Sequence, residues 1–147
     1  MAEFDFADEM DESRTNVYLA GPLSDIDDPE YVHEHIKDVT SEQGLRDKLN
    51  WVDPMNLEPE FANGWEMIRK DLEAVENVDA VLAYRPAGAE SWGTQREIAH
   101  AQKVNTPVVI WNMDGGDFNH WMTRPFVVED ELSVALDAVL ALAKLRL

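Results

Sequence analysis

The sequence predicts an α/β fold, namely a flavodoxin-like (Rossmann-like) three-layer sandwich with a five-stranded parallel sheet. Two features of the chain predict this class, namely its short apolar runs and their alternation with helical patterns. Five short apolar runs, of the kind found in strands that are buried on both faces, alternate with helical patterns of about ten or more residues. Right-handed crossovers between parallel strands then place the helices on both faces of the sheet. With 147 residues, the chain has the length of a single domain.

The predicted elements alternate along the chain in the way that such a sheet requires. Strands are expected at NVYLA (residues 16–20), NWVDP (50–54), DAVLAY (79–84), PVVIW (107–111) and FVV (126–128). Helices are expected at residues 31–49, with a weak point at Gly44, and at residues 61–75, 94–103 and 130–145. We assign residues 16–147 to one domain. Residues 1–15 are acidic and have no sustained periodicity, so we expect a disordered N-terminal arm there.

The chain is strongly acidic, with 30 Asp and Glu residues against 12 Lys and Arg residues and a formal net charge of -18. Such a charge destabilises a compact fold in dilute salt and is screened in concentrated salt, which indicates a halophilic surface. The alternative is an acidic protein without this adaptation. Because an acidic surface repels phosphate backbones, polymeric nucleic acid is not an expected partner.

The sequence also lacks the usual signs of export or membrane insertion. No apolar run approaches the roughly 18 residues that a membrane-spanning helix needs. No signal-peptide pattern is visible at the N-terminus, and there are no cysteines for disulfides or thiolate chemistry. We therefore expect a cytoplasmic protein with no membrane partner.

Ligands of doubly wound sheets bind beyond the carboxyl ends of the strands, where the strand order reverses. In this chain, the loops after Ala20, Asp53, Tyr84 and Trp111 follow the predicted strands. We expect these loops to supply the binding site.

Glu97 is the first candidate for chemistry, because it lies near the start of the helix that follows the third predicted strand. Gly93 and Thr94 precede it, and Gly93 lets a ligand approach the backbone closely. Free N–H groups and the positive end of the helix dipole favour an ionised carboxylate at this position. Such a carboxylate can act as a nucleophile or stabilise a cation. The alternative is an ordinary acidic residue placed early in a helix.

Asp71 is the second candidate. It lies at the edge of an apolar stripe on its helix, so we expect it to be half-buried, and partial burial raises the pKa of a carboxyl group. A raised pKa suits a proton donor. The alternative is an ion pair with Arg69, Lys70 or another basic residue. One ionised and one protonated carboxyl group together form the pattern that cleaves glycosidic bonds through an oxocarbenium-like transition state.

Three further features near the predicted strands have less specific meanings. The hydroxyl of Tyr18 could reach the rim of the site or be a satisfied core hydroxyl, and Gly21 could bring backbone N–H groups to a ligand or simply make a turn. His33 and His35 lie near several aspartates, but their spacing fits neither a zinc site nor a calcium loop. The glycine fingerprints of phosphate-binding loops and dinucleotide folds are absent. We therefore expect no metal and no organic cofactor.

Three stretches of the chain, taken together, resemble the nucleoside 2-deoxyribosyltransferase family, which includes the related 2'-deoxynucleoside 5'-monophosphate N-glycosidases. They are VYLAGPLS on the first strand, the Asp71 helix running into NVDAVLAY, and SWGTQREIAHAQKVNTPVVIWN. The resemblance covers roughly residues 16–125 and keeps their order and spacing. It implies a flavodoxin-like fold and double displacement at the anomeric carbon of a 2-deoxynucleoside.

The resemblance also implies roles for particular residues. Glu97 would be the nucleophile that forms a deoxyribosyl ester, Tyr18 would orient its carboxylate, and Asp71 would contact the base or sugar and assist proton transfer. A free base then accepts the sugar in the transferases, whereas water accepts it in the N-glycosidases. The residues expected to bind the substrate are Gly21, Pro22, Ser91, Trp92, Gly93, Thr94, Asn119 and His120.

Ser91 departs from the transferase pattern, in which an Asp usually stands two residues before the Gly of the GT pair. The monophosphate N-glycosidases have a Ser there that helps to bind the 5'-phosphate, which a carboxylate would repel. Ser91 therefore favours a nucleotide substrate. The family also implies a homodimer or larger homo-oligomer, in which Asn119 or His120 of a second chain completes the site. A non-catalytic nucleotide-binding or sensor module on the same fold is the alternative function.

Overall fold

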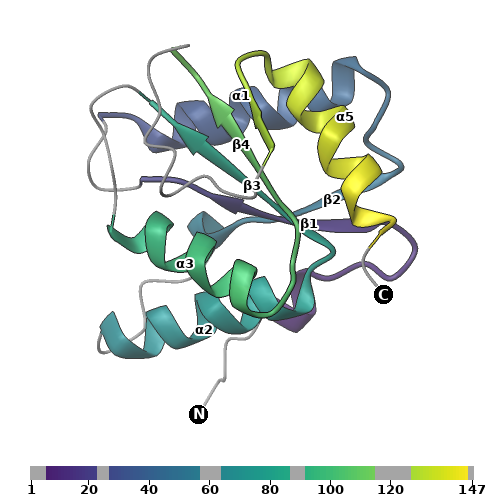
Figure 1. The fold of residues 1–147 in the computed structure, drawn as a ribbon. Helices are drawn as coiled ribbons and strands as arrows, with labels where there is room; N and C mark the ends of the chain where they lie inside the picture. Colours follow the sequence, from purple (N-terminus) through teal and green to yellow (C-terminus); the bar gives the residue numbers. More distant parts are fainter. Residues whose placement is uncertain (1–5, 23–26, 57–63, 87–91, 115–126, 146–147) are drawn as a thin grey trace.

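The computed structural model describes residues 6–22, 27–56, 64–86, 92–114 and 127–145. A five-stranded sheet forms its centre, with the strand order β2-β1-β3-β4-β5, and each neighbouring pair is parallel (Figure 1). The strands are β1 (Thr15–Ala20), β2 (Leu49–Val52), β3 (Ala80–Arg85), β4 (Val108–Asn112) and β5 (Val127–Glu129). The predicted fold class, α/β with a five-stranded parallel sheet, is confirmed.

Helices cover both faces of the sheet, as right-handed crossovers require (Figure 1). Helices α1 (Pro29–Glu42) and α5 (Leu132–Ala143) pack on one face, and α2 (Gly64–Asn77) and α3 (Trp92–Lys103) pack on the other. Successive side chains of β1 point to opposite faces of the sheet. Val17 and Leu19 pack in the core under α1 and α5, whereas Tyr18 and Ala20 pack in the core under α2 and α3. Tyr18 therefore faces the layer that contains α2 and α3.

Helix α1 ends at Glu42, earlier than the predicted end at residue 49. Gly44 adopts a φ of 71°, in the left-handed region that favours glycine. The N–H of Gly44 donates to the carbonyl of Ser41, and the N–H of Leu45 donates to the carbonyl of Thr40. This pair of hydrogen bonds is a Schellman motif, which terminates a helix. The predicted weak point at Gly44 is therefore the stop signal itself.

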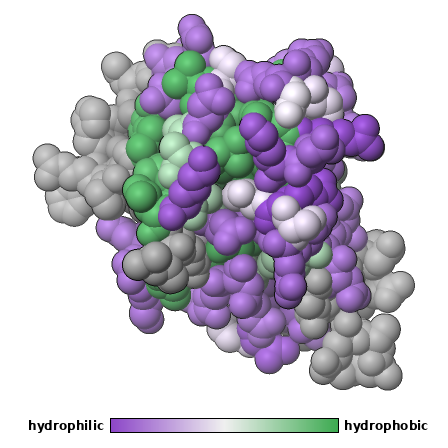
Figure 2. Space-filling model, turned by 90° about the vertical axis from the view of Figure 1, so that its right-hand side faces the viewer, coloured by the Kyte–Doolittle hydropathy of each residue, from purple (hydrophilic) through white to green (hydrophobic). Residues whose placement is uncertain are grey.

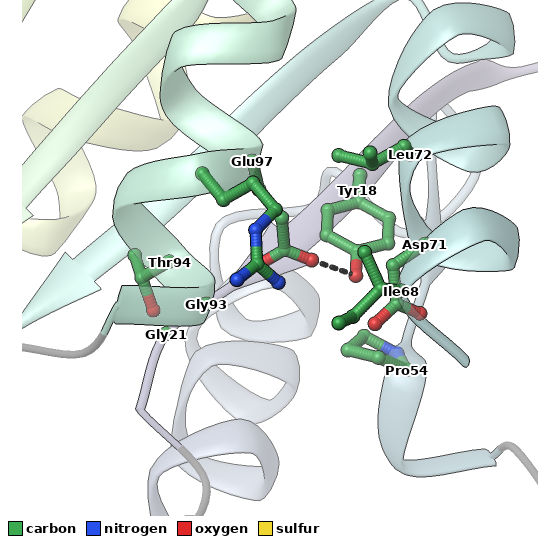
Figure 3. Close-up of a pocket in the computed structure, with 10 residues that line it drawn as sticks. Tyr18, Gly21, Pro54, Ile68, Asp71, Leu72, Gly93, Thr94 and Glu97 are labelled. Atoms are coloured by element: carbon green, nitrogen blue, oxygen red, sulfur yellow. Dashed lines mark hydrogen bonds between the residues drawn. The ribbon is translucent and has the colours of Figure 1, made fainter. Parts of the chain in front are cut away.

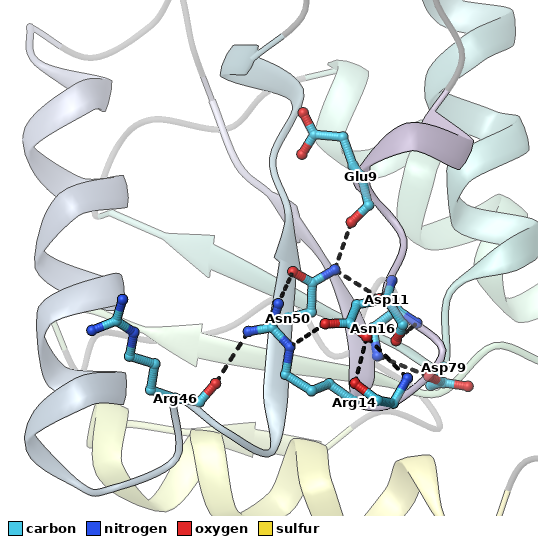
Figure 4. A network of polar contacts seen from close by, with 8 residues as sticks. Glu9, Asp11, Arg14, Asn16, Arg46, Asn50 and Asp79 are labelled. Carbon is cyan, nitrogen blue, oxygen red and sulfur yellow. Dashed lines mark hydrogen bonds and ion pairs between the residues drawn. The ribbon is translucent and has the colours of Figure 1, made fainter.

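The segment that we expected to be a disordered arm has defined structure from Phe6 onward. It begins with the short 3-10 helix η1 (Phe6–Glu9), and Figure 4 shows the polar network that follows. Arg14 pairs with Asp11 at 2.6 Å and donates to the side-chain oxygen of Asn50 at 3.3 Å, while Asn50 donates to the carbonyl of Glu9 at 2.6 Å. Because Asn50 lies on β2, far along the chain, local composition did not predict this order.

The face shown in Figure 2 is largely hydrophilic, and hydrophobic residues gather in one area of it. That side corresponds to the right of Figure 1, where α5 lies. On and just after α5, Val134 and Leu145 are exposed. None of the helices in the described ranges is both long enough and apolar enough to cross a membrane.

Candidate active site

A pocket opens at the carboxyl end of β1, between α2 and α3 (Figure 3). This position is next to the point where the strand order reverses, because β2 and β3 lie on opposite sides of β1. The pocket lies at the carboxyl end of β1, which is where we expected the binding site from the loops that follow the strands. Its lining residues are Tyr18, Gly21, the first residue of the short helix η2 (Pro54–Asn56), Ile68, Asp71, Leu72, Gly93, Thr94, Arg96 and Glu97.

Tyr18 and Glu97 are joined at the bottom of this pocket. The hydroxyl of Tyr18 donates a hydrogen bond to Oε2 of Glu97, and both side chains are buried. Burial, followed by the charges of Glu97 and Asp71, holds the pKa of Tyr18 well above its usual value. The hydroxyl therefore keeps its proton and remains a donor to the carboxylate. A donor aimed at Glu97 stabilises the ionised form of that group.

Asp71 approaches the same hydroxyl from the other side. Figure 3 shows Asp71 on α2 and Glu97 on α3, with the Tyr18 hydroxyl between the two carboxyl groups. Burial raises the pKa of Asp71 to about 7, although a hydrogen bond with Tyr18 acts in the opposite direction. Its Oδ1 atom is buried without a hydrogen-bond partner among the residues that the structure describes. The predicted raised pKa of Asp71 is therefore found, whereas an ion pair with Arg69 or Lys70 is not seen there.

Glu97 does not have the charge state that its helix position predicted. Burial, and then the charge of Asp71, raise the pKa of Glu97 to about 8, and the Tyr18 hydrogen bond and the charge of Arg96 offset only part of this. Glu97 lies five residues after Trp92, the first residue of α3, so it is beyond the turn whose free N–H groups act most strongly. Desolvation therefore outweighs the helix dipole. At neutral pH, the pair of carboxyl groups retains a proton.

The other predicted substrate-binding residues are distributed unevenly. Gly21, Gly93 and Thr94 line the pocket. Pro22 follows Gly21 at the rim but does not itself line the pocket; it is buried, and its carbonyl accepts a hydrogen bond from Tyr84. Ser91, Asn119 and His120 lie outside the described residues, as does the side chain of Trp92.

We did not assign Ile68 and Leu72 to the site from the sequence, although both line the pocket. They belong to the apolar stripe of α2. The stripe is buried only at its far end: Val75 is 0% exposed, whereas Trp65 is 71% exposed. The apolar stripe of α2 therefore has two uses: Val75 packs in the core against the sheet, whereas Ile68 and Leu72, nearer the start of the helix, line the pocket.

A second buried polar cluster, which the sequence did not reveal, lies beneath the α1 face of the same edge. Asp53 accepts from His33 Nδ1 at 2.8 Å and pairs with Lys37 at 2.8 Å. His33 Nε2 lies 2.8 Å from the hydroxyl of Tyr84. Burial acts to raise the pKa of Asp53, but the interactions with His33, Lys37 and the backbone N–H of Met55 outweigh it and lower the pKa to about 2. Asp53 is therefore a stably ionised group.

No metal site accompanies these clusters in the part of the chain that the structure describes. There, no group of three or more His, Cys, Asp or Glu residues is arranged to hold a metal ion.

No protein-family model and no curated protein matches the sequence, but solved structures match the fold. A 2-deoxyribosyltransferase from Bacillus psychrosaccharolyticus superposes with a TM-score of 0.65 at 18% identity, over 82% of this chain and 89% of that chain. A 2-deoxyribosyltransferase from Leishmania mexicana has a TM-score of 0.65 at 15% identity, over 86% and 97% of the two chains. A CMP N-glycosidase from Clostridium botulinum has a TM-score of 0.54 at 16% identity, over 84% and 97%.

The chain shares their fold. At these identities the similarity concerns the fold, and the chemistry has to be argued from the pocket. The resemblance that the sequence motifs indicated is thus matched by the arrangement of the strands and helices.

Proposed function

We propose that this protein cleaves the N-glycosidic bond of 2'-deoxynucleosides or their 5'-monophosphates through a covalent deoxyribosyl intermediate on Glu97. One observation carries the proposal: two buried carboxyl groups with raised pKa values, Asp71 and Glu97, meet in one pocket with a tyrosine hydroxyl between them. Solved structures with the same fold include both 2-deoxyribosyltransferases and a CMP N-glycosidase.

The first step uses the single proton that the pair retains. In the productive state, the proton is on Asp71 and Glu97 is ionised, which the hydrogen bond from Tyr18 favours. A carboxylate oxygen of Glu97 bonds to the anomeric carbon as the bond from that carbon to the base nitrogen breaks. The electron pair of the broken bond goes to the base, and the proton of Asp71 follows it. The sugar is then an ester of Glu97, and Asp71 is ionised.

The second step reverses the roles. The ionised Asp71 accepts a proton from an incoming water molecule or acceptor base, whose oxygen or nitrogen bonds to the anomeric carbon. The bond between that carbon and Glu97 breaks, and its electron pair returns to the carboxylate. With water the product is a free sugar or sugar phosphate, and with a base it is a new nucleoside.

The experiment that tests the proposal separates these outcomes. Protein in concentrated salt is incubated with deoxynucleosides and deoxynucleotides, with and without an acceptor base, and the products are separated by chromatography. A new nucleoside that requires the acceptor indicates a transferase, and free base with deoxyribose 5-phosphate indicates an N-glycosidase. Release of base by Glu97→Ala at the rate of the parent protein would exclude the mechanism.

A second candidate, a nucleotide-binding module without turnover, is favoured by one observation. Burial raises the pKa of Glu97 to about 8, so the free protein at neutral pH holds this group mainly in its non-nucleophilic form. Tight nucleotide binding by calorimetry, with no product after prolonged incubation at a pH above 8, would support the module. Quenched intact-protein mass spectrometry that detects one added deoxyribosyl group would exclude it.

We also propose a homo-oligomer with shared active sites, on the basis of the family resemblance. Asn119 or His120 of a second chain would then reach the sugar. Light scattering of the purified protein measures the assembly. A monomer with full turnover would exclude shared sites.

A further inference from the structure

The buried cluster around His33 lies next to the pocket but contributes no lining residue to it. His33, Asp53 and Tyr84 are each 1% exposed, and the cluster lies among the side chains of the α1 and α5 layer. The pocket opens on the opposite layer, between α2 and α3. The proposed reaction makes no direct use of this cluster, so its position behind the site needs another explanation.

Tyr84 connects the cluster to the pocket. Its ring fills the place where a side chain at Gly21 would be, because a Cβ built on Gly21 lies 2.2 Å from the ring carbons. Its hydroxyl donates to the carbonyl of Pro22 at 3.1 Å. Gly21 itself lines the pocket. The rim of the pocket at Gly21 is therefore one layer of backbone, with the ligand space on one side and the tyrosine on the other.

The hydrogen bonds of the cluster form a series that requires a definite number of protons. Asp53, His33, Tyr84 and Pro22 are linked by three contacts of 2.8, 2.8 and 3.1 Å. Each contact needs one proton, and neither a carboxylate nor a carbonyl can supply one. Asp53 is ionised and the hydroxyl of Tyr84 supplies a single proton. All three hydrogen bonds therefore form only when His33 carries protons on both ring nitrogens.

We propose that His33 is a positioning residue, which through Tyr84 holds the Gly21–Pro22 rim in place for the substrate, and which does so only when both of its ring nitrogens are protonated. When His33 loses the proton on Nε2, the Tyr84 hydroxyl can donate to that nitrogen or to the Pro22 carbonyl, but not to both. The Pro22 carbonyl then competes with His33 for the one hydroxyl proton, so the hydrogen bond that holds the rim is weakened. As a statement about substrate binding, this inference rests on the proposed function.

Both charged and neutral groups lie around His33 on the elements packed against it. Asp53 at the end of β2 is negative and Lys37 on α1 is positive, and Tyr84 on β3 is neutral because burial, followed by the charges of Asp53 and Glu97, raises its pKa well above the usual value. Glu9 lies within electrostatic reach of Asp53 and Lys37. The buried residues of α5 are all apolar. Because the three hydrogen bonds need both ring protons, the rim is held when His33 carries both protons and is released when His33 loses one.

The structural part of the test uses nuclear magnetic resonance and does not depend on turnover. The bond from Pro22 to Leu23 is the only Pro–Leu peptide in the sequence, so labelling proline with ¹³C at the carbonyl and leucine with ¹⁵N isolates the Pro22 carbonyl signal. Labelling histidine with ¹⁵N reports both ring nitrogens, and the His33→Gln spectrum assigns His33. We expect the Pro22 carbonyl to shift at the pH at which His33 loses its second proton, and this step to vanish in Tyr84→Phe. A carbonyl signal that is constant through the His33 titration would overturn the proposal.

The kinetic part measures KM and kcat against pH for the parent protein and Tyr84→Phe. Loss of one neutral hydrogen bond to the rim should raise KM about 3- to 10-fold, with kcat little changed. The parent protein shows this rise as the pH passes the His33 midpoint, whereas Tyr84→Phe has the raised KM throughout. Tyr31→Phe and His35→Gln change exposed residues of α1 and are the matched controls, expected to follow the parent.

The two failures are distinguishable. If the parent protein turns over no nucleoside or nucleotide, the proposed function fails, and the carbonyl and imidazole signals still decide the role of His33. If the parent turns over and Tyr84→Phe has the same KM at every pH, the positioning role fails alone. Circular dichroism of His33→Gln and Tyr84→Phe verifies that each is folded. The comparison depends on Tyr84→Phe, which keeps the ring against Gly21.

Discussion

Two polar clusters lie at the carboxyl ends of the strands, on opposite faces of the sheet, one with a single carboxyl group and one with two, and burial acts on all three groups in the same direction. Around Asp53, a histidine, a lysine and a backbone N–H surround the carboxylate, and its pKa falls to about 2. In the pocket, Asp71 and Glu97 have mainly each other and Tyr18, and their pKa values rise to about 7 and about 8. A buried carboxyl group therefore stays ionised and stabilises the fold where its partners offset the effect of burial on its pKa. Where they do not, the carboxyl group keeps a raised pKa and remains available for proton transfer.

The largest expected effect is on turnover, and it comes from a change in the pocket rather than in the Asp53 cluster. Glu97→Gln should lower turnover by about 1000-fold or more, since it removes the proposed nucleophile while keeping its shape. Turnover of deoxynucleosides or deoxynucleotides is measured by chromatography. Glu73→Gln changes an exposed glutamate on α2 and serves as the control. Comparable turnover in Glu97→Gln and the control would remove the pocket pair from the mechanism.

Asp71→Asn should reduce kcat by about 100- to 1000-fold, because the leaving base loses its proton donor. The charge of Asp71 raises the pKa of Glu97, so this variant should also lower that pKa below about 8. Turnover needs an ionised Glu97 and rises with pH through its titration, and the acid limb of the pH–rate profile should therefore move to lower pH. Asp137→Asn, on the exposed side of α5, is the control. An acid limb that stays in place would show that the two groups are not coupled.

Asp53→Asn should act on stability, by about 2–3 kcal/mol in the free energy of unfolding at pH 7. The pKa of Asp53 is lowered from 3.8 to about 2, so its charge stabilises the fold above pH 4, and this contribution is lost as the pH falls from about 4 to about 2. Urea unfolding of the parent and the variant at several pH values measures the difference. Asp38→Asn on the exposed face of α1 is the control. A difference that does not shrink below pH 4 would assign the effect to packing.

The pocket pair should behave in the opposite way. The folded pKa of Glu97 is raised, so its ionisation opposes folding increasingly as the pH rises from about 4 to about 8. Glu97→Gln should therefore increase the free energy of unfolding by about 1–3 kcal/mol at pH 9, and the gain should disappear near pH 4. Urea unfolding at the two pH values tests this, with Glu73→Gln as the control. A loss of stability at pH 9 would contradict the contrast between the clusters.

The fold was predictable because each element has a local signal. The apolar runs predicted β1, β3 and β4 within one residue at each end, and the alternation of strands and helices predicted the parallel sheet. The end of α1 was missed because the left-handed conformation of Gly44 depends on how the chain turns into β2. The order of the N-terminal segment was missed because Arg14 finds its partners 32 and 36 residues later.

The pocket was predictable in position but not in charge. The rule that ligands bind at carboxyl ends of strands led to Tyr18, Gly21 and the start of α3. The pKa of Glu97 is raised by burial beside Tyr18, which is 79 residues away in the sequence. The position of Glu97 in its helix, taken alone, predicts a lowered pKa. The partners of His33 in its cluster are Asp53 and Tyr84, which are 20 and 51 positions away in the sequence, so no local pattern predicts the cluster.

The two clusters also act on each other across the sheet. Burial is the main reason for the raised pKa of both tyrosines, but the charge of Asp53 contributes at Tyr18 in the pocket, and the charge of Glu97 contributes at Tyr84 on the opposite layer. A proton gained or lost on one face therefore alters the electric field on the other without any atom having to move. The sheet acts here as a thin layer of low dielectric between two charged clusters, and the field at the Tyr18 hydroxyl in the pocket depends in part on a charge that the pocket does not contain.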